Sequence, residues 1–94
     1  MQVSFNSALD DGRAHHAIGQ VKAVGRWRGA NGLNLEAEQQ AALRALMREA
    51  AEYGADALVD VRFEIDNCAR AEIDGAPLRR VAAIGSAVRF ALAA

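Results

Sequence analysis

The sequence has little of what usually stabilises a small domain or carries its chemistry. It contains one cysteine, Cys68, one proline, and only 5% aromatic residues among 94. A single cysteine excludes an internal disulfide and is typical of a reducing compartment, so we expect a cytoplasmic protein. The net charge is −1, from 11 basic and 12 acidic residues, which argues against the clustered positive charge of a nucleic-acid-binding surface.

Long apolar runs are also missing. No segment approaches the roughly 20 apolar residues that span a bilayer, and no basic segment followed by an apolar stretch opens the chain. We therefore expect neither a membrane partner nor a signal peptide. The glycines form no dinucleotide or phosphate-binding pattern, and no serine has the context of a nucleophile elbow. These observations predict a protein that is not an enzyme and that has no cofactor.

Alanine is abundant, with 22 of the 94 residues. Each alanine buries little apolar area, and a single domain of this length buries only roughly 60–65% of its unfolded surface. The core is therefore expected to be thin. Thin cores are commonly supplemented by disulfides, a metal or oligomerisation. Because one cysteine cannot form an internal disulfide, oligomerisation is the favoured supplement.

One amphipathic helix is predicted over residues 35–53. Asn34 is a suitable N-cap, and Glu36 and Glu38 place negative charge in the first turn, where the helix dipole favours it. Gly54 supplies the left-handed residue on which helices commonly end. The spacing of the apolar residues predicts that the buried face consists of Leu43, Leu46, Met47 and Ala50.

Strands are predicted near residues 3–7, 15–28, 57–65 and 78–90, from apolar–polar alternation and turn signals. Residues 66–77 read as a polar connection with a turn at Asp74–Gly75. The fold class is therefore α+β: a small antiparallel sheet packed by one main helix, in a single domain over residues 1–94. We expect this domain to assemble into a homo-oligomer.

The last strand has an unusual face. Its inward parity is predicted to be Ala82, Ile84, Ser86, Val88 and Phe90. The opposite parity presents Ala83, Gly85 and Ala87, a smooth apolar strip that suits close approach by another subunit. The outward face of the preceding strand offers Asp60, Arg62 and Glu64, and its charged groups are placed to pair with Arg89 across the sheet or across such an interface. The alternative is that a terminal helix or the first strand of the same chain covers this strip.

Few residues invite a chemical interpretation. His15 and His16 are metal candidates, but adjacent strand residues point to opposite faces, so a site would need symmetry copies of one histidine. Cys68 follows acidic residues, which disfavour a reactive thiolate. The carboxylates of Asp60 and Glu64 lie on one predicted strand face and could form an acid–base pair, although such a face is more often simply solvated.

Three short segments resemble a known family. Residues 49–61 read EAAEYGADALVDV, residues 83–88 read AIGSAV, and residues 18–21 read IGQV. They are similar to motifs of the YbjQ-like family, also called DUF74, whose members carry a heavy-metal-binding label. The resemblance extends from about Val3 to Phe90. It implies a small α/β fold that assembles as a homopentamer, with strands of neighbouring subunits contributing, and it implies no assigned reaction.

With the ring that the resemblance implies, the first functional hypothesis is a ring-like homo-oligomer, a pentamer, of unassigned biochemical role. It would bind a small ligand or a partner protein at a subunit interface. The second is a metal-binding or metal-sensing module with symmetry-related His15 or His16 ligands. The third is a small enzyme that uses Asp60 or Glu64 as acid or base, which predicts a polar cleft beside that strand.

Overall fold

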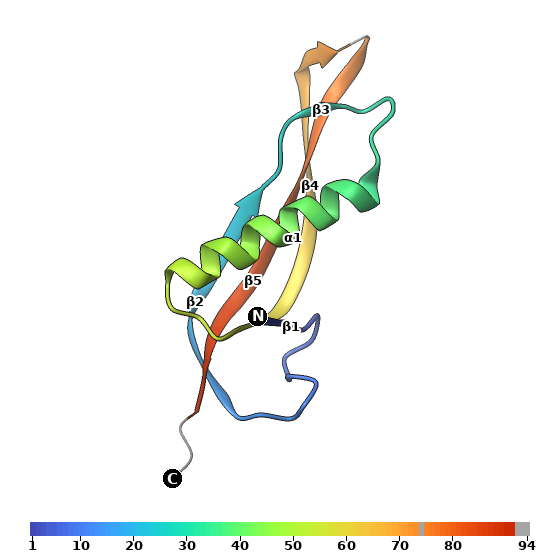
Figure 1. The fold of residues 1–94 in the computed structure, drawn as a ribbon. Helices are drawn as coiled ribbons and strands as arrows, with labels where there is room; N and C mark the ends of the chain where they lie inside the picture. The colour runs from blue at the N-terminus through green and yellow to red at the C-terminus, as the bar shows by residue number, and fades with distance from the viewer. Residues whose placement is uncertain (74, 92–94) are drawn as a thin grey trace.

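The computed structural model describes residues 1–73 and 75–91, and it contains five strands and one helix within them (Figure 1). In chain order the elements are β1 (Gln2–Val3), β2 (His15–Val24), β3 (Arg28–Gly29), α1 (Leu35–Glu52), β4 (Ala57–Ile73) and β5 (Ala76–Phe90). The predicted combination of one main helix with a sheet is confirmed, which makes this an α+β fold.

The sheet is built around β5. Its strand order is β1–β4–β5–β2, and β3 pairs with β5 beyond the end of β2. β2, β3 and β4 all run antiparallel to β5, whereas β1 runs parallel to β4 over two residues. The sheet is therefore mixed, and the prediction of a purely antiparallel sheet was wrong at β1. Sequence alternation cannot reveal this, because strand direction depends on how the intervening chain returns.

β4 and β5 continue through the predicted loop at 66–77. β4 reaches Ile73 and β5 begins at Ala76, so most of that segment is a hairpin. Gly75 has φ 78°, as its predicted turn role requires, while Asp74 lies outside the described residues. The segment reads as a loop because it lacks apolar alternation. A two-stranded ladder that projects beyond the core does not need that alternation. We call residues 66–73 and 75–80 the arm.

The helix follows its predicted signals. The Asn34 side chain accepts a hydrogen bond from the Ala37 amide at 3.1 Å, and Gly54, with φ 76°, follows the C-cap residue Tyr53. The face that meets the sheet is shifted by one residue from the prediction. Ala42, Leu46 and Ala50 are buried, whereas Leu43 and Met47 are only partly buried at its margin.

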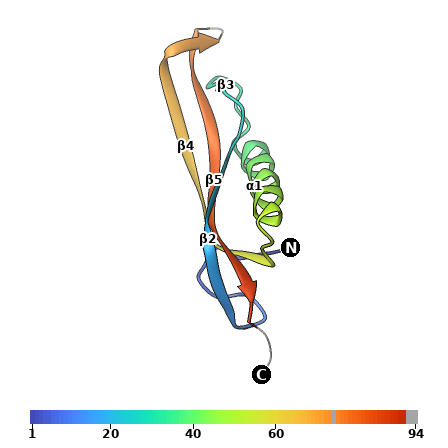
Figure 2. The ribbon, with the colours of Figure 1, turned by 90° about the vertical axis from the view of Figure 1, so that its left-hand side faces the viewer.

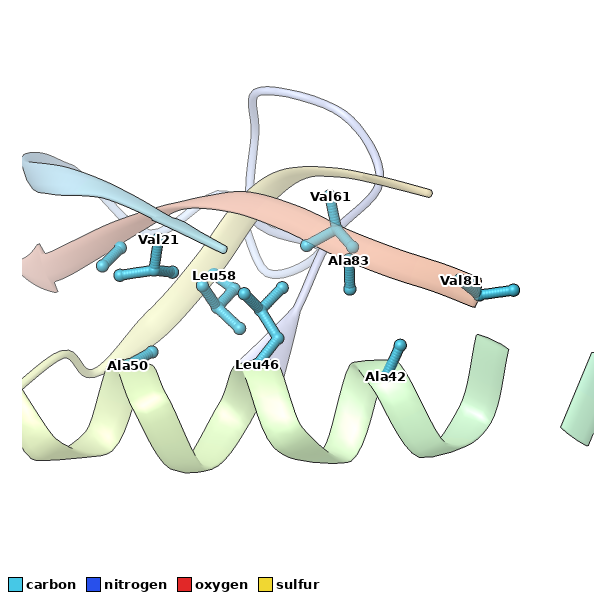
Figure 3. Close-up of a cluster of buried hydrophobic side chains, with 9 residues drawn as sticks. Val21, Ala42, Leu46, Ala50, Leu58, Val61, Val81 and Ala83 are labelled. Carbon is cyan, nitrogen blue, oxygen red and sulfur yellow. The ribbon is translucent and has the colours of Figure 1, made fainter. Parts of the chain in front are cut away.

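The molecule has two layers, with α1 on one face of the sheet (Figure 2). The helix packs its buried residues on a cluster from all three long strands (Figure 3). This cluster contains Val21, Leu58, Val61, Val81, Ala83 and Ala87. Small strand residues allow the helix to lie close to the sheet. A smaller cluster, formed by Leu9, Ala57, Val59 and Val88, lies apart from it.

The chain is long and narrow. Its principal extents are 59 × 21 × 15 Å and its radius of gyration is 15.6 Å, against about 12 Å for a compact domain of this length. Figure 1 shows the reason: the arm extends past the helix, while the C-terminal end of β5 extends past it in the other direction. No described helix is long and apolar enough to cross a membrane.

Candidate functional site

The predicted interface strip is covered from within the chain. Ala83 and Ala87 are fully buried in the cluster beneath α1, and Gly85 lies between them on the same face. A Cβ atom at Gly85 would lie 3.1 Å from Val61 Cγ2 and 3.5 Å from Leu46 Cδ2. The smooth strip is thus a seat for the helix, and not a free surface for a neighbouring subunit. The strip is covered within the same chain, but by α1 and not by a terminal helix or the first strand. The predicted inward and outward faces of β5 were therefore wrong, since Ala83 and Ala87 face the helix.

The set of alternate β4 side chains that faces the helix changes at a β-bulge. The pairing register with β5 shifts between Val59 and Arg62, and Asp60 has φ 52°, the only positive value among the described non-glycine residues. Before the bulge Leu58 faces the helix, and after it Val61 does. The predicted single parity from Ala57 to Ile65 was therefore wrong, because one extra residue reverses the alternation.

The N-terminal segment holds this bulge in place. The amide of Asp60 donates to the Asn6 carbonyl at 3.0 Å, and the amide of Val61 donates to the Ser4 carbonyl at 3.2 Å. Ser4 is itself buried, and its hydroxyl donates to the Ala8 carbonyl at 2.7 Å. A left-handed residue other than glycine costs of order 1 kcal/mol, so these contacts fix a conformation that the chain would otherwise avoid.

A shallow hollow of about 550 Å³ lies beside the bulge, lined by Phe5, Gln20, Asp60, Val61, Arg62 and Ser86. Its polar groups include a carboxylate, a guanidinium, an amide and a hydroxyl, so both signs of charge are present. Glu64, the other predicted acid–base candidate, does not line it. The polar cleft expected beside this strand is present, and Asp60 lines it. Glu64 lies outside it, so the two carboxylates do not share one cleft.

The predicted ion pair with Arg89 is not formed by these carboxylates. Arg89 donates from Nε to the Gly54 carbonyl at 3.1 Å and thus closes the C-terminal end of α1 against β5. Arg62 lies 3.9 Å, Nε to Oε1, from Glu64, and both side chains are about half exposed. An exposed pair at this distance contributes little to stability. Asp60, Arg62 and Arg89 remain on the surface, where an interface could use them.

The histidines lie on opposite faces of β2, as predicted. His15 pairs with Phe90 and His16 with Arg89 in the register of β2 and β5. His16 lines a hollow of about 300 Å³ together with Asp56, Arg89 and Phe90. Cys68 is half-buried on the arm. Within the described residues, no three His, Cys, Asp or Glu side chains come together as metal ligands would.

Sequence reasoning missed the contacts at the base of the arm. Asp66 and Arg80 are cross-strand partners and form an ion pair at 2.8 Å, and the Arg80 guanidinium lies 4.5 Å from the centre of the Trp27 ring. Arg28 reaches Glu38 of the helix at 3.0 Å. Arg80 and Arg28 thus tie the β2–β3 segment to the arm and to α1.

The sheet leaves two of its strand edges open. Only β5 pairs with β2, so the outer edge of β2 has no partner strand within residues 1–73 and 75–91. β1 pairs with β4 at Ala57 and Leu58, and no strand of the described part of the chain pairs with the outer edge of β4 from Arg62 to Ile73. Exposed aliphatic side chains lie on both strands: Ile18 and Val24 on β2, and Ile65 on β4.

These features define a two-layer α+β domain with one helix on one sheet face and strand edges free for pairing. The chain belongs to the YbjQ_1 family, whose model matches residues 16–91 and carries the description "Putative heavy-metal-binding". This confirms the family resemblance read from the sequence.

A crystal structure of a DUF74 protein of unknown function from Pediococcus pentosaceus ATCC 25745 has the same fold, with a TM-score of 0.68. It shares 14% sequence identity with this chain, and the alignment covers 97% of this chain and 98% of that one. No curated protein matches the sequence.

Proposed function

We propose that the protein is a non-catalytic module that acts as a homo-oligomer, a ring-shaped pentamer, and binds a small ligand or partner protein at surfaces completed between subunits. The observation that carries the proposal is the pair of open strand edges on an elongated, two-layer chain. Open edges with exposed aliphatic side chains are a liability for a monomer and a template for association. We place this assembly in the cytoplasm, since the chain has one free thiol and no disulfide partner for it.

Native mass spectrometry of untagged protein tests this proposal, because it reports the number of subunits and any bound mass together. A spectrum dominated by a pentamer supports it. A monomer at micromolar concentration overturns it, and a stable dimer overturns the ring. Additional mass on the assembly, released on gentle activation, would identify a ligand by its weight.

A metal-binding module is the second candidate, favoured by the description of the family and by one observation. His16 and Asp56 line the same hollow, so symmetry copies of these side chains could complete a ligand set that one chain lacks. His15 lies on the opposite face of β2 and supplies a matched control.

Elemental mass spectrometry measures the metal content of the purified assembly and decides between the two candidate functions. Metal that is lost in His16→Ala and kept in His15→Ala supports the second candidate. Metal that survives both substitutions, or a protein that takes up no Zn²⁺, Cu²⁺ or Ni²⁺ when each is offered at a twofold excess, removes it.

A further inference from the structure

The hollow beside the β4 bulge is built from separate parts of one chain. Phe5 comes from the N-terminal segment, Gln20 from β2 and Ser86 from β5, while Asp60 and Arg62 belong to the bulged part of β4. The residues on either side of Ser86 face α1, so Ser86 and its register partner Gln20 lie on the opposite face of the sheet. The bulge thus brings two charged side chains next to two neutral polar ones.

The hollow contains one group of each charge, and the two are not paired with each other. Within residues 1–73 and 75–91, the Asp60 carboxylate forms no ion pair. The Arg62 guanidinium has one ionic contact there, the exposed one to Glu64, which measures 3.9 Å from Nε to Oε1. A ligand with a net charge is attracted by one of the two groups and repelled by the other. A ligand that carries both charges satisfies both groups.

The backbone at Asp60 favours a role for its carboxylate. Its φ of 52° is unfavourable for a residue with a side chain, and such residues cluster at functional sites. Glycine would form the same bulge without that cost. The strained backbone is held by amide bonds from the bulge to Ser4 and Asn6, so the carboxylate is fixed at the rim of the hollow before any ligand arrives.

Phe5 supplies an apolar wall. Its side chain is 63% exposed, and its ring centre lies 6.3 Å from that of Phe63, a separation typical of packed aromatic pairs. A ring that is positioned by a second ring offers apolar surface at a small cost in conformational freedom. The Gln20 amide and the Ser86 hydroxyl can each donate to a carboxylate or accept from an ammonium group. Together these groups match a ligand with an ammonium, a carboxylate and an apolar part.

We propose that this hollow binds a free α-amino acid with an apolar side chain. Asp60 accepts hydrogen bonds from the ammonium group, Arg62 donates to the carboxylate, and the ligand side chain lies against Phe5. This inference rests on the proposed binding function and names the class of ligand. Because one chain supplies all of these residues, the site does not depend on the number of subunits. For so small a ligand we expect a dissociation constant on the order of 0.1–1 mM.

Three probes that differ in one charge each test the proposal. They are phenylalanine, 3-phenylpropanoate, which lacks the ammonium group, and 2-phenylethylamine, which lacks the carboxylate. We expect wild-type protein to bind phenylalanine about tenfold more tightly than either analogue, because each analogue leaves one charged group of the hollow without a partner.

Two substitutions should then give opposite patterns. Asp60→Asn is expected to weaken phenylalanine binding about tenfold and to leave 3-phenylpropanoate binding within about threefold or stronger. Arg62→Gln is expected to weaken phenylalanine binding equally and to leave 2-phenylethylamine binding within about threefold. Asparagine tolerates positive φ, so the bulge is kept. Arg44→Gln, the same change at an exposed helix position, is the control.

Titrations followed by the backbone amide signals in NMR report both affinity and place, and the signals of Gln20, Arg62 and Ser86 should shift. The opposite patterns, with an unchanged control, support the site. A variant that loses affinity for all three probes alike overturns the assignment of the charges. Native mass spectra of the same samples report the assembly. No shifts with phenylalanine at roughly ten times the expected dissociation constant, in protein that is assembled, overturn the site and leave the proposed self-assembly intact.

Two further probes test the ligand class. Glucose is neutral and polar, and glucose that binds in the hollow as tightly as phenylalanine overturns the amino-acid assignment. Glycine has both charges and no side chain to meet Phe5, so we expect it to bind about tenfold more weakly than phenylalanine. Equal binding of glycine and phenylalanine overturns the role of Phe5.

Discussion

At the scale of single residues, Asp60 is the position where the chain departs most from ordinary backbone geometry. Its φ of 52° places a side-chain-bearing residue in the region that glycine adopts most readily. Two hydrogen bonds from the bulge to the N-terminal segment hold it there. The result is that a carboxylate lies at the rim of the hollow, while Val61 is directed to the core beneath α1.

Asp60→Gly is expected to be as stable as the wild type or more stable, by up to about 1 kcal/mol, because relief of strain offsets the added freedom of the unfolded chain. Asp60→Val is expected to lose about 1–2 kcal/mol, since a β-branched residue fits this conformation poorly.

Urea unfolding at one fixed protein concentration measures both variants. Asp60→Asn, which keeps the size and tolerates positive φ, is the control and should stay within about 0.5 kcal/mol. Equal stability of the glycine and valine variants would show that the bulge imposes no strain at Asp60.

At the scale of the elements, the bounds of the helix could be predicted closely, its buried face only in part, and the sheet only in outline. Asn34, Gly54 and the apolar spacing are local signals, and they act within one turn of chain. The bulge at Asp60 is not local: Gly85 on β5 leaves room for Val61, and Ser4 accepts the Val61 amide. An apolar–polar alternation in the sequence cannot reveal the extra residue of this bulge, because only residues distant in the sequence stabilise it.

The candidate surfaces were predicted less well than the fold, for a related reason. Ala83, Gly85 and Ala87 were predicted to form an outward strip for another subunit, but the strip faces α1, because small residues suit a helix as well as a subunit. Which of the two covers it depends on how the bulge sets the faces of β4 and on where α1 docks. The open edges of β2 and β4 could not be predicted, because strand order is a property of the assembled sheet.

The arm depends on the contacts at its base. Trp27, 39% exposed, lies under Arg80, which also pairs with Asp66. A cation–π contact at a partly exposed site contributes about 0.5–1 kcal/mol. We expect Trp27→Ala to speed amide exchange in the arm about two- to fivefold and to leave exchange in α1 unchanged.

Hydrogen exchange followed residue by residue checks this prediction. Trp27→Phe keeps an aromatic face and should retain most of the protection. Acceleration throughout the molecule in Trp27→Ala would instead indicate global destabilisation, and no change in the arm would show that Arg80 does not depend on the ring.

At the scale of the whole molecule, stability and assembly should be linked. A chain of this shape covers only one face of its sheet with a helix, and its core is rich in alanine. A thin core of this kind gains stability when subunits associate, by mass action.

For a pentamer, a hundredfold rise in protein concentration is expected to raise the free energy of unfolding by about 2 kcal/mol per subunit. Chemical denaturation at about 1 μM and about 100 μM protein measures this free energy at the two concentrations. A midpoint that is independent of concentration contradicts the link.

The order of the strands also has a consequence for synthesis. β2 ends at Val24, and its sheet partner β5 begins only at Ala76, 52 residues later in the chain. At roughly 5–20 residues per second, a nascent chain carries β2 for about 3–10 s before its partner exists. During translation β2 therefore has both edges unpaired, with Ile18 and Val24 among its side chains. Neighbouring nascent chains on one polysome bring identical copies of β2 close together. The charge of Lys22 and the polar side chains of His15 and His16 disfavour pairing between these copies.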